Sequence, residues 1–146
     1  MTSIDEPGAR HDGRAAGAED VVDLSIPVRA DLVVLARLAA ATVGSRAGFD
    51  VEEVEDLRLA VDELCVSLVG KGAGGRLSLR FVRDDHEVEV SCIHRRDGPA
   101  TVDGTGVDLE DLSATILDAL VDEHGRDVQD GQPRMWLRKR RARPES

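Results

Sequence analysis

The feature that most constrains the fold is a long amphipathic segment in the first half of the chain. Its large aliphatic residues recur at alternating spacings of three and four, which is the period of an α-helix. These residues are Val54, Leu57, Val61, Leu64 and Leu68. Asp50 and Glu53 form the pattern of a capping box at its start. The segment is therefore predicted to be a helix from about Val51 to Val69, and its apolar face must pack against another element.

The two segments that follow this helix alternate apolar and polar residues, which is the period of a β-strand. They cover Arg76–Arg83 and Glu87–His94, joined by the short link 84–86. The inward residues are Leu77, Leu79, Phe81, Val88, Val90 and Cys92. This pattern predicts a β-hairpin with one apolar face.

The preceding part of the chain predicts a strand over residues 21–26, closed by Pro27, and a helix from Arg29 to about Arg46. The inward residues of this helix are expected to be Leu32, Leu35, Ala36, Ala39 and Val43. Residues 70–75, rich in glycine, follow a helix and precede a strand. That is the reverse of the order in a phosphate-binding P-loop, so they are interpreted as a connector.

The last third of the chain predicts a third helix, capped by Asp108 and ending near His124. Its inward residues are expected to be Leu109, Leu112, Ile116, Leu117, Leu120 and Val121. A closing hairpin is expected from strands 126–130 and 134–140, which turn at Asp130-Gly131. Met135 and Leu137 should share one face of the second strand, with Trp136 on the other.

The predicted order, β-α-α-β-β-α-β-β, indicates an α+β fold: a two-layer α/β sandwich with a largely antiparallel sheet and helices on one face. Residues 1–19 contain a single large aliphatic residue, so we expect a disordered tail. The folded domain is then expected to span 20–140, followed by a basic tail over 141–146.

Charge and composition narrow the choice of partner. The 146 residues contain 29 acidic against 19 basic side chains, and only 2% are aromatic. Residues 138–146 hold five of the basic groups and one acid, so separating them at Leu137 leaves a strongly acidic body. Such a body repels DNA, and the chain has almost no aromatic platforms for base stacking. A basic protein is the expected partner, and direct nucleic-acid binding is not expected.

The chain has no signal-peptide pattern and no apolar run of about 20 residues that could span a membrane. Its two cysteines, Cys65 and Cys92, lie inside apolar periodic segments. With His94 they lack the spacing of a zinc site. We therefore expect a soluble, reduced, cytoplasmic protein that does not interact with membranes.

Residues 56–69, DLRLAVDELCVSLV, resemble the N-box helix of RsbW-type anti-sigma factors. These are serine-protein kinases of the GHKL ATPase superfamily. The preceding residues 26–57 are similar to that family's first helix and its link to the second. The resemblance is strongest to actinobacterial regulators of a stress-type sigma factor, many of which have degenerate nucleotide boxes.

The resemblance implies two nucleotide-site residues on this helix. Glu63 matches the family's general base, and Ser67 stands where the family has an Asn that binds Mg²⁺. A Ser hydroxyl can bind Mg²⁺, but an amide carbonyl is the stronger ligand. Glu63 also projects well away from the apolar face, so the alternative that it is a solvated acid stays open.

The family's other two nucleotide boxes are altered in this chain. The second box has an Asp that reads adenine, followed by glycines. If Gly98 is aligned with a glycine of this box, Arg96 stands at the position of the Asp, and Asp97 is one residue out of place. In the other possible alignment, Val102 stands at the position of the Asp. Neither Arg nor Val can accept a hydrogen bond from the adenine amino group. The alternative is a turn-rich loop.

The third box lacks its glycines and carries acids instead. These are Asp108, Glu110 and Asp111. Acids at this helix start repel phosphate. The cofactor expectation is therefore none, with ATP and Mg²⁺ possible only if the altered site still binds.

The sequence indicates a surface for partner proteins more strongly than it indicates a nucleotide site. Arg37 stands where the resemblance places an Arg that contacts partners, although a surface Arg with no such role is the alternative. Leu59 and Val66 lie opposite the apolar face of the second helix, as an interface or as isolated surface residues.

The leading hypothesis is an anti-sigma factor that sequesters an alternative, stress-type sigma factor. The resemblance implies a homodimer, released from the sigma factor by an antagonist of the small α/β STAS type. The first alternative is an active serine-protein kinase that uses ATP, Mg²⁺ and Glu63 to phosphorylate that antagonist. The second is a non-catalytic sensor or adaptor on the same fold.

Overall fold

The computed structural model describes residues 20–69, 74–96 and 107–142, with side chains in the last range described from Leu112 onward. The elements follow the predicted order. They are β1 (Asp20–Pro27), a 3₁₀ turn (Ala30–Leu32), α1 (Val33–Arg46), α2 (Val51–Val69), β2 (Arg76–Arg83), β3 (Glu87–Arg95), α3 (Val107–Leu120), β4 (Glu123–Gln129) and β5 (Gln132–Arg140). The expected tail 1–19 and residues 143–146 lie outside the described residues.

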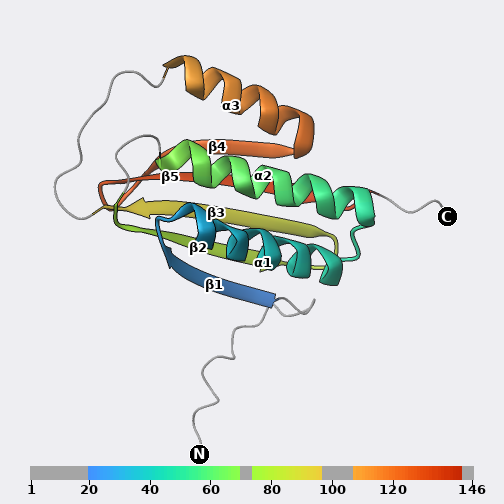
Figure 1. The fold of residues 1–146 in the computed structure, drawn as a ribbon. Coiled ribbons are helices and arrows are strands. Elements are labelled where there is room, and N and C mark those ends of the chain that lie inside the picture. The colour runs from blue at the N-terminus through green and yellow to red at the C-terminus, as the bar shows by residue number, and fades with distance from the viewer. Residues whose placement is uncertain (1–19, 70–73, 97–106, 143–146) are drawn as a thin grey trace, which may run out of the picture.

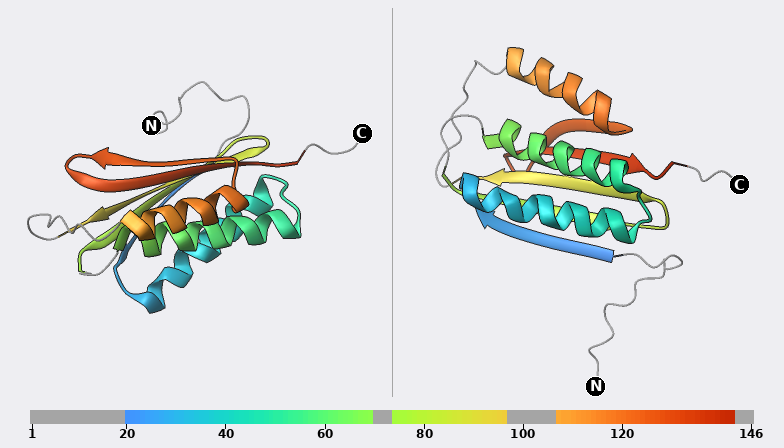
Figure 2. Two further views of the ribbon diagram at one scale, coloured as in Figure 1. Left: turned by 90° about the horizontal axis from the view of Figure 1, so that it is seen from above. Right: turned by 45° about the vertical axis from the view of Figure 1, so that its right-hand side comes forward.

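The five strands form one antiparallel sheet in the order β1-β2-β3-β5-β4. All three helices lie on the same face of this sheet, and α2 lies between α1 and α3 (Figure 1). Figure 2 shows the two layers from above, with the other face of the sheet left bare by the described helices. The predicted fold class, a two-layer α+β sandwich, is confirmed.

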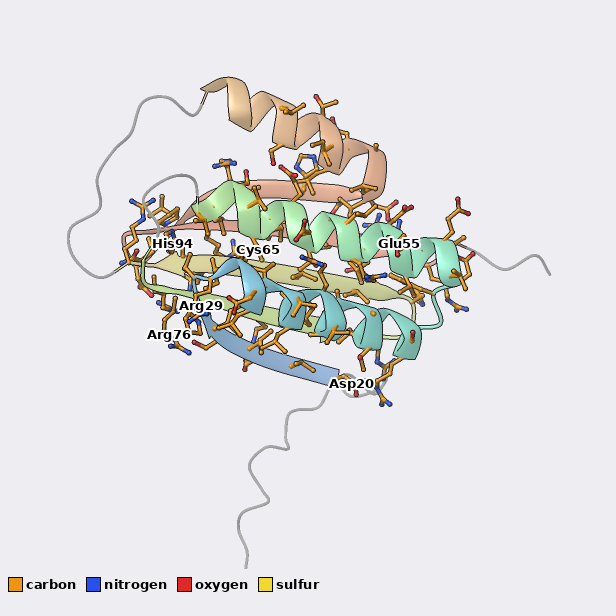
Figure 3. The ribbon with its side chains drawn as sticks, viewed as in Figure 1. Asp20, Arg29, Glu55, Cys65, Arg76 and His94 are labelled. Atoms are coloured by element: carbon orange, nitrogen blue, oxygen red, sulfur yellow. The ribbon has the colours of Figure 1, made fainter. Side chains whose placement is uncertain are left out.

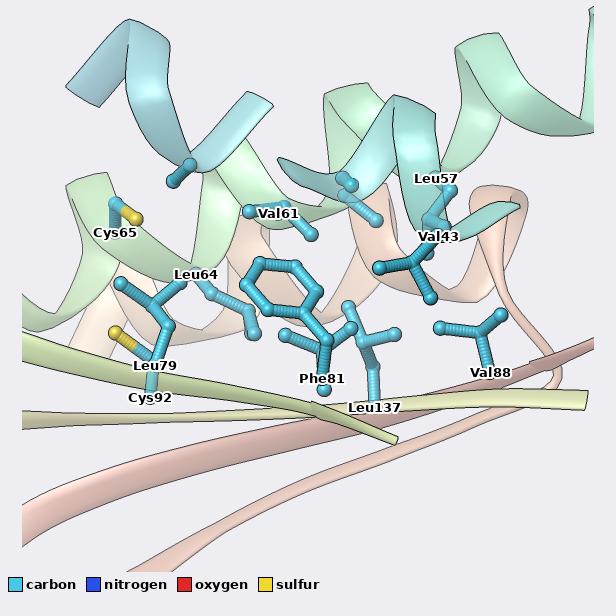
Figure 4. Packing of buried hydrophobic residues seen from close by; sticks show 14 of the residues in the cluster. Val43, Leu57, Val61, Leu64, Cys65, Leu79, Phe81, Val88, Cys92 and Leu137 are labelled. Atoms are coloured by element: carbon cyan, nitrogen blue, oxygen red, sulfur yellow. The ribbon is translucent and has the colours of Figure 1, made fainter. Parts of the chain in front are cut away.

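The core lies between α2 and the central strands. The predicted apolar face of α2 is buried, with Leu57, Val61 and Leu64 fully inaccessible. The inward residues of the β2–β3 hairpin meet it, with Phe81 at the centre (Figure 4). The predicted capping box also forms, because the Asp50 and Glu53 side chains each accept a hydrogen bond of 2.8 Å from the other's backbone N–H.

The inward face of α1 is confirmed at Ala36 and Val43 and differs from the prediction at Leu35, which is 40% exposed. Ala40 and Gly44, which were not predicted to face inward, are also buried. A Cβ at Gly44 would lie 3.3 Å from the Leu57 side chain. The helix therefore packs closely through small residues, whose weak hydropathy hides the buried face in the sequence.

The end of α3 also differs. The helix ends at Leu120 rather than near His124, and His124 pairs with Leu137 across β4 and β5. The nearly buried Lys139 ammonium donates to the Leu120 carbonyl at 2.8 Å, which satisfies a terminal helix carbonyl. Leu112, expected inside, is 56% exposed.

The closing hairpin forms with strands longer than predicted. It turns at Asp130 and Gly131, whose φ angles of 54° and 76° suit the expected two-residue turn. Met135 and Leu137 are buried, and Trp136 lies on the opposite face as predicted, stacked over Gly125. No Cβ fits at Gly125, because it would lie 2.8 Å from the Trp136 ring.

Residues 138–146 were counted in the sequence as a basic terminus separate from an acidic body. This separation is wrong for Arg138 and Arg140. Arg138 and Arg140 lie in β5, where Arg138 pairs with Glu123 and Arg140 lies 3.3 Å from Glu87. The chain stays bonded past the strand, since the Arg141 N–H donates to the His86 carbonyl at 2.7 Å. These cations therefore neutralise acids of the sheet.

Asp20, at the start of the edge strand β1, forms ion pairs whose contribution to stability can be tested. Its carboxylate accepts hydrogen bonds from Arg46 of α1 and Arg83 of β2, and these lower its pKa from 3.8 to about 2. The unfolded carboxyl is protonated near pH 4 and the folded one only near pH 2, so this stabilisation is present above pH 4 and is lost as the pH falls between them. We expect Asp20→Asn to lower the free energy of unfolding at pH 7 by about 1 kcal/mol, allowing for solvent screening.

Urea unfolding of both proteins at pH 7 and near pH 3 measures this difference, which should shrink at the lower pH. Asp31→Asn is the matched control, because its partner Arg29 is 63% exposed and the pair should contribute little. If Asp20→Asn lowers the free energy of unfolding equally at both pH values, the ionised Asp20 carboxylate is not the source of the stabilisation.

Candidate functional site

The predicted site residues lie on two different sides of α2. One side faces α1, where the Arg37 guanidinium donates to the Asp62 carboxylate at 3.1 Å. Both side chains remain more than one third exposed, so this pair stays accessible to a partner. The sequence selected Arg37 but gave no indication of its partner, which lies 25 positions further along the chain.

Apolar side chains surround this ion pair on the outward side of the helices. Leu59 and Val66 of α2 are 48% and 61% exposed, as their opposition to the core predicts. Val34 and Leu38 of α1 are also exposed, and Val34 lies one helical turn before Arg37. We call these four residues and the Arg37–Asp62 pair the outer helical face. Exposed aliphatic side chains gathered around a charged pair are typical of a protein-binding surface.

The other side of α2 faces α3 and carries Ser67. The Ser67 hydroxyl donates to the Ser113 hydroxyl at 3.1 Å, and the Arg126 guanidinium donates to Ser67 at 3.3 Å. Ser113 is buried, so α3 packs directly against the N-box helix at this point. Glu63, one turn earlier, is partly exposed and forms no hydrogen bond or ion pair with a described residue.

The Ser67 hydroxyl, at the position of the family's Mg²⁺ ligand, is already engaged by Ser113 and Arg126. A guanidinium already contacts the Ser67 oxygen that would bind the metal, and like charges repel. A separate hollow of about 200 Å³ lies between α3 and the β4–β5 hairpin, and neither Glu63 nor Ser67 lines it. No group of three or more described His, Cys, Asp or Glu side chains could hold a metal ion.

The remaining nucleotide-box residues are only partly described. Asp97 and Gly98 lie outside the described residues, as do the side chains of Asp108, Glu110 and Asp111. Arg96, at the adenine-reading position of one register, donates through Nε to the Nδ1 of His94 at 3.4 Å.

His94 is the polar residue of this region whose role the sequence did not reveal. It is fully buried, and its Nε2 lies 2.8 Å from the Gly74 carbonyl oxygen. Figure 3 shows it at the end of the sheet. Since Nδ1 accepts from Arg96, Nε2 carries the proton and donates to Gly74. His94 therefore joins β3 to the start of β2, and strand alternation alone could have placed it on the core side.

The two cysteines lie in the core as a neighbouring pair (Figure 4). A hydrogen bond with Cys65, together with burial, raises the pKa of the Cys92 thiol. The thiolate is the reactive form of cysteine, so this environment disfavours nucleophilic chemistry at Cys92.

The element order, the one-sided antiparallel sheet and the α2 helix together define a GHKL-like α/β sandwich. Similar proteins carry the name serine-protein kinase RsbW. The one from Bacillus subtilis (strain 168) is 28% identical over 121 residues, covering 71% of this chain and 76% of the relative. The one from Bacillus pumilus (strain SAFR-032) is 35% identical over 77 residues, about half of each chain.

A third relative, from Listeria monocytogenes serotype 4b (strain F2365), is 33% identical over 98 residues, covering 65% of this chain and 58% of the relative. These matches confirm the resemblance to RsbW-type proteins that residues 56–69 indicate. No protein-family model matches the chain.

The arrangement around Ser67 predicts weak nucleotide binding at most. We expect titration of the full chain with Mg-ATP to give no saturable binding in the micromolar range, because Ser113 and Arg126 already engage the position of the metal ligand. Isothermal titration calorimetry measures this directly. Micromolar binding that Glu63→Ala or Ser67→Ala weakens would contradict this expectation, with Thr42→Ala on the far helix as the matched control.

Proposed function

We propose that this protein is an anti-sigma factor that sequesters an alternative, stress-type sigma factor. The observation that carries the proposal is the outer helical face, which stays open on a scaffold similar to RsbW while α3 packs against the Ser67 side of α2. The function depends on a protein-binding surface and requires no bound nucleotide. It also requires a cytoplasmic location, where sigma factors meet RNA polymerase.

Charge supports a sigma factor as the partner. The chain carries ten more acidic than basic groups, and α2 carries Glu52 and Glu55 as exposed side chains and Glu63 as a partly exposed one. Sigma factors present basic helices to DNA, so an acidic surface attracts the groups that DNA would otherwise meet. Complementary charge of this kind accelerates association and selects partners. Leu59 and Val66 would supply the apolar contacts, and Arg37 a charged contact.

Substitutions on this face test the proposal. We expect Leu59→Asp or Val66→Asp to weaken binding of a stress-type sigma factor about tenfold or more, because each places a charge in the apolar centre of the interface. Arg37→Ala should weaken binding as well. Surface plasmon resonance with the immobilised sigma factor measures each effect.

The matched control is Val128→Asp on β4, a valine that is 70% exposed and distant from the outer helical face. It should bind as the unsubstituted chain does. Equal binding by all variants, or no binding to any stress-type sigma factor of the host, would refute the proposal.

The resemblance supports two further proposals about partners. An antagonist of the STAS type would release the sigma factor by competing for the outer helical face. The protein would also form a homodimer through the edge of the sheet at β1. This strand pairs only with β2 among the described strands, and Val21 and Val22 on it are exposed, as is Leu35 of α1. An unpaired edge with exposed valines is a surface that other chains can cover.

Analytical ultracentrifugation tests the homodimer. We expect a dimer for the full chain and a shift toward monomer for Val22→Lys, because a charge on the edge strand opposes pairing. A dimer that Val22→Lys and Leu35→Lys leave intact would exclude the β1 edge as its interface, and a monomer in the unsubstituted chain would exclude the dimer.

The kinase alternative is favoured by the names of the relatives and by the presence of Glu63 at the position of the general base. In that case Glu63 would take the proton of the substrate hydroxyl and Ser67 would help to hold Mg²⁺. The Mg-ATP titration described above decides between this alternative and the proposal. The surface plasmon resonance experiment tests the second alternative, because a sensor or adaptor of this kind would bind no sigma factor.

A further inference from the structure

The bare face of the sheet contains a hollow that the proposed function does not use. It lies on the opposite side from the helices, across β1, β2, β3 and the β4–β5 hairpin. Strand alternation directs mostly polar side chains into it, in contrast to the apolar side chains of the core face; Asp23 and Ile93 line it as well. We call it the serine–arginine hollow, lined by Ser25, Ser78, Ser91, Arg80, Arg95 and Arg134.

Two of these arginines are neutralised by aspartates. Arg80 forms two hydrogen bonds with the Asp23 carboxylate, at 2.9 and 3.2 Å. Arg134 donates to both oxygens of Asp127, at 3.1 and 2.8 Å. Each of these carboxylates therefore balances the charge of one arginine in the hollow.

Arg95 and its neighbour Arg76 are not neutralised in this way. They are direct partners across β2 and β3, both on the bare face and both exposed. Like charges directly opposite each other destabilise a sheet. Neither forms an ion pair with a carboxylate of the described residues, although the chain carries 29 acidic side chains.

Serine hydroxyls hold both guanidinium groups in place. Arg76 donates to the Ser25 hydroxyl at 2.9 Å and to the Ser25 carbonyl at 3.1 Å. Arg95 donates to the Ser78 hydroxyl at 3.1 Å. Because each hydroxyl accepts a bond from an arginine, its own proton remains available to donate. The paired arginines and serines thus present hydrogen-bond donors, and no carboxylate of the described residues forms an ion pair with either arginine.

We propose that the serine–arginine hollow, with Arg76 at its rim, binds a phosphoryl oxyanion. Arg95 and Arg76 would bind its oxygens through charge-assisted hydrogen bonds, and the Ser25 and Ser78 hydroxyls would donate to the same group. A bound dianion would also remove the repulsion between the two arginines. The group could belong to inorganic phosphate or to a small phosphate monoester, which offer the same oxygens.

Thermal unfolding of the full chain tests this site. Inorganic phosphate should raise Tm in a saturable way, because a ligand that binds only the folded state stabilises it. Sodium chloride at the same ionic strength should not. Arg95→Gln and Arg76→Gln should each weaken phosphate binding about tenfold, the effect of losing one charge-assisted contact. Without phosphate neither should lower Tm, since each removes a like-charge neighbour.

Arg58→Gln is the matched control, because Arg58 lies on α2 and pairs with Glu55 at 2.7 Å. It should keep the full response to phosphate. In NMR spectra of the unsubstituted chain, the Nε–Hε signals of Arg76 and Arg95 should shift during the titration.

Phenyl phosphate separates the two sources of the group. Tighter binding of phenyl phosphate would indicate an ester as the ligand, and binding of inorganic phosphate alone would indicate the free ion. An equal response to chloride, a response that survives both Arg95→Gln and Arg76→Gln, or no response at all would overturn the proposal.

Discussion

The packing of α2 onto the central strands is the contact on which the rest of the structure depends. Its apolar stripe buries Leu57, Val61 and Leu64 against the inward residues of β2 and β3. Because the side chains of a strand alternate with a period of two, this register also determines which side chains reach the bare face. The helix then presents its two other sides to α1 and α3. One contact therefore positions the outer helical face, the Ser67 side and the serine–arginine hollow.

The sequence predicted those parts of the fold in which burial and periodicity agree. The stripe of α2, its capping box, the β2–β3 hairpin and the turn at Asp130-Gly131 all carry strong local patterns, and all form. In α1 the sequence wrongly placed Leu35 inside and missed Ala40 and Gly44, because that helix packs through small side chains that give little hydropathy signal. The end of α3 was mispredicted because it depends on a distant residue: Lys139, 19 positions away, satisfies the Leu120 carbonyl.

The same distinction holds for the candidate site. Exposure of Leu59 and Val66 follows from helical geometry, and the structure has them exposed as expected. The contacts of Ser67 with Ser113 and Arg126 join residues 46 and 59 positions apart, and no local pattern indicates them. The sequence indicates that the strand ends at His94 and that Arg95 and Arg96 begin a loop. Alternation along the strand could have placed His94 on the core side, but only the register shows that Arg95 stands opposite Arg76.

The central claim is that this RsbW-like scaffold binds a sigma factor through its outer helical face without a nucleotide. The most direct test is calorimetric titration of the full chain with a stress-type sigma factor, in the absence and in the presence of Mg-ATP. The account predicts saturable binding with the same affinity in both conditions. Binding that appears only when Mg-ATP is present would contradict it, as would the absence of binding in both.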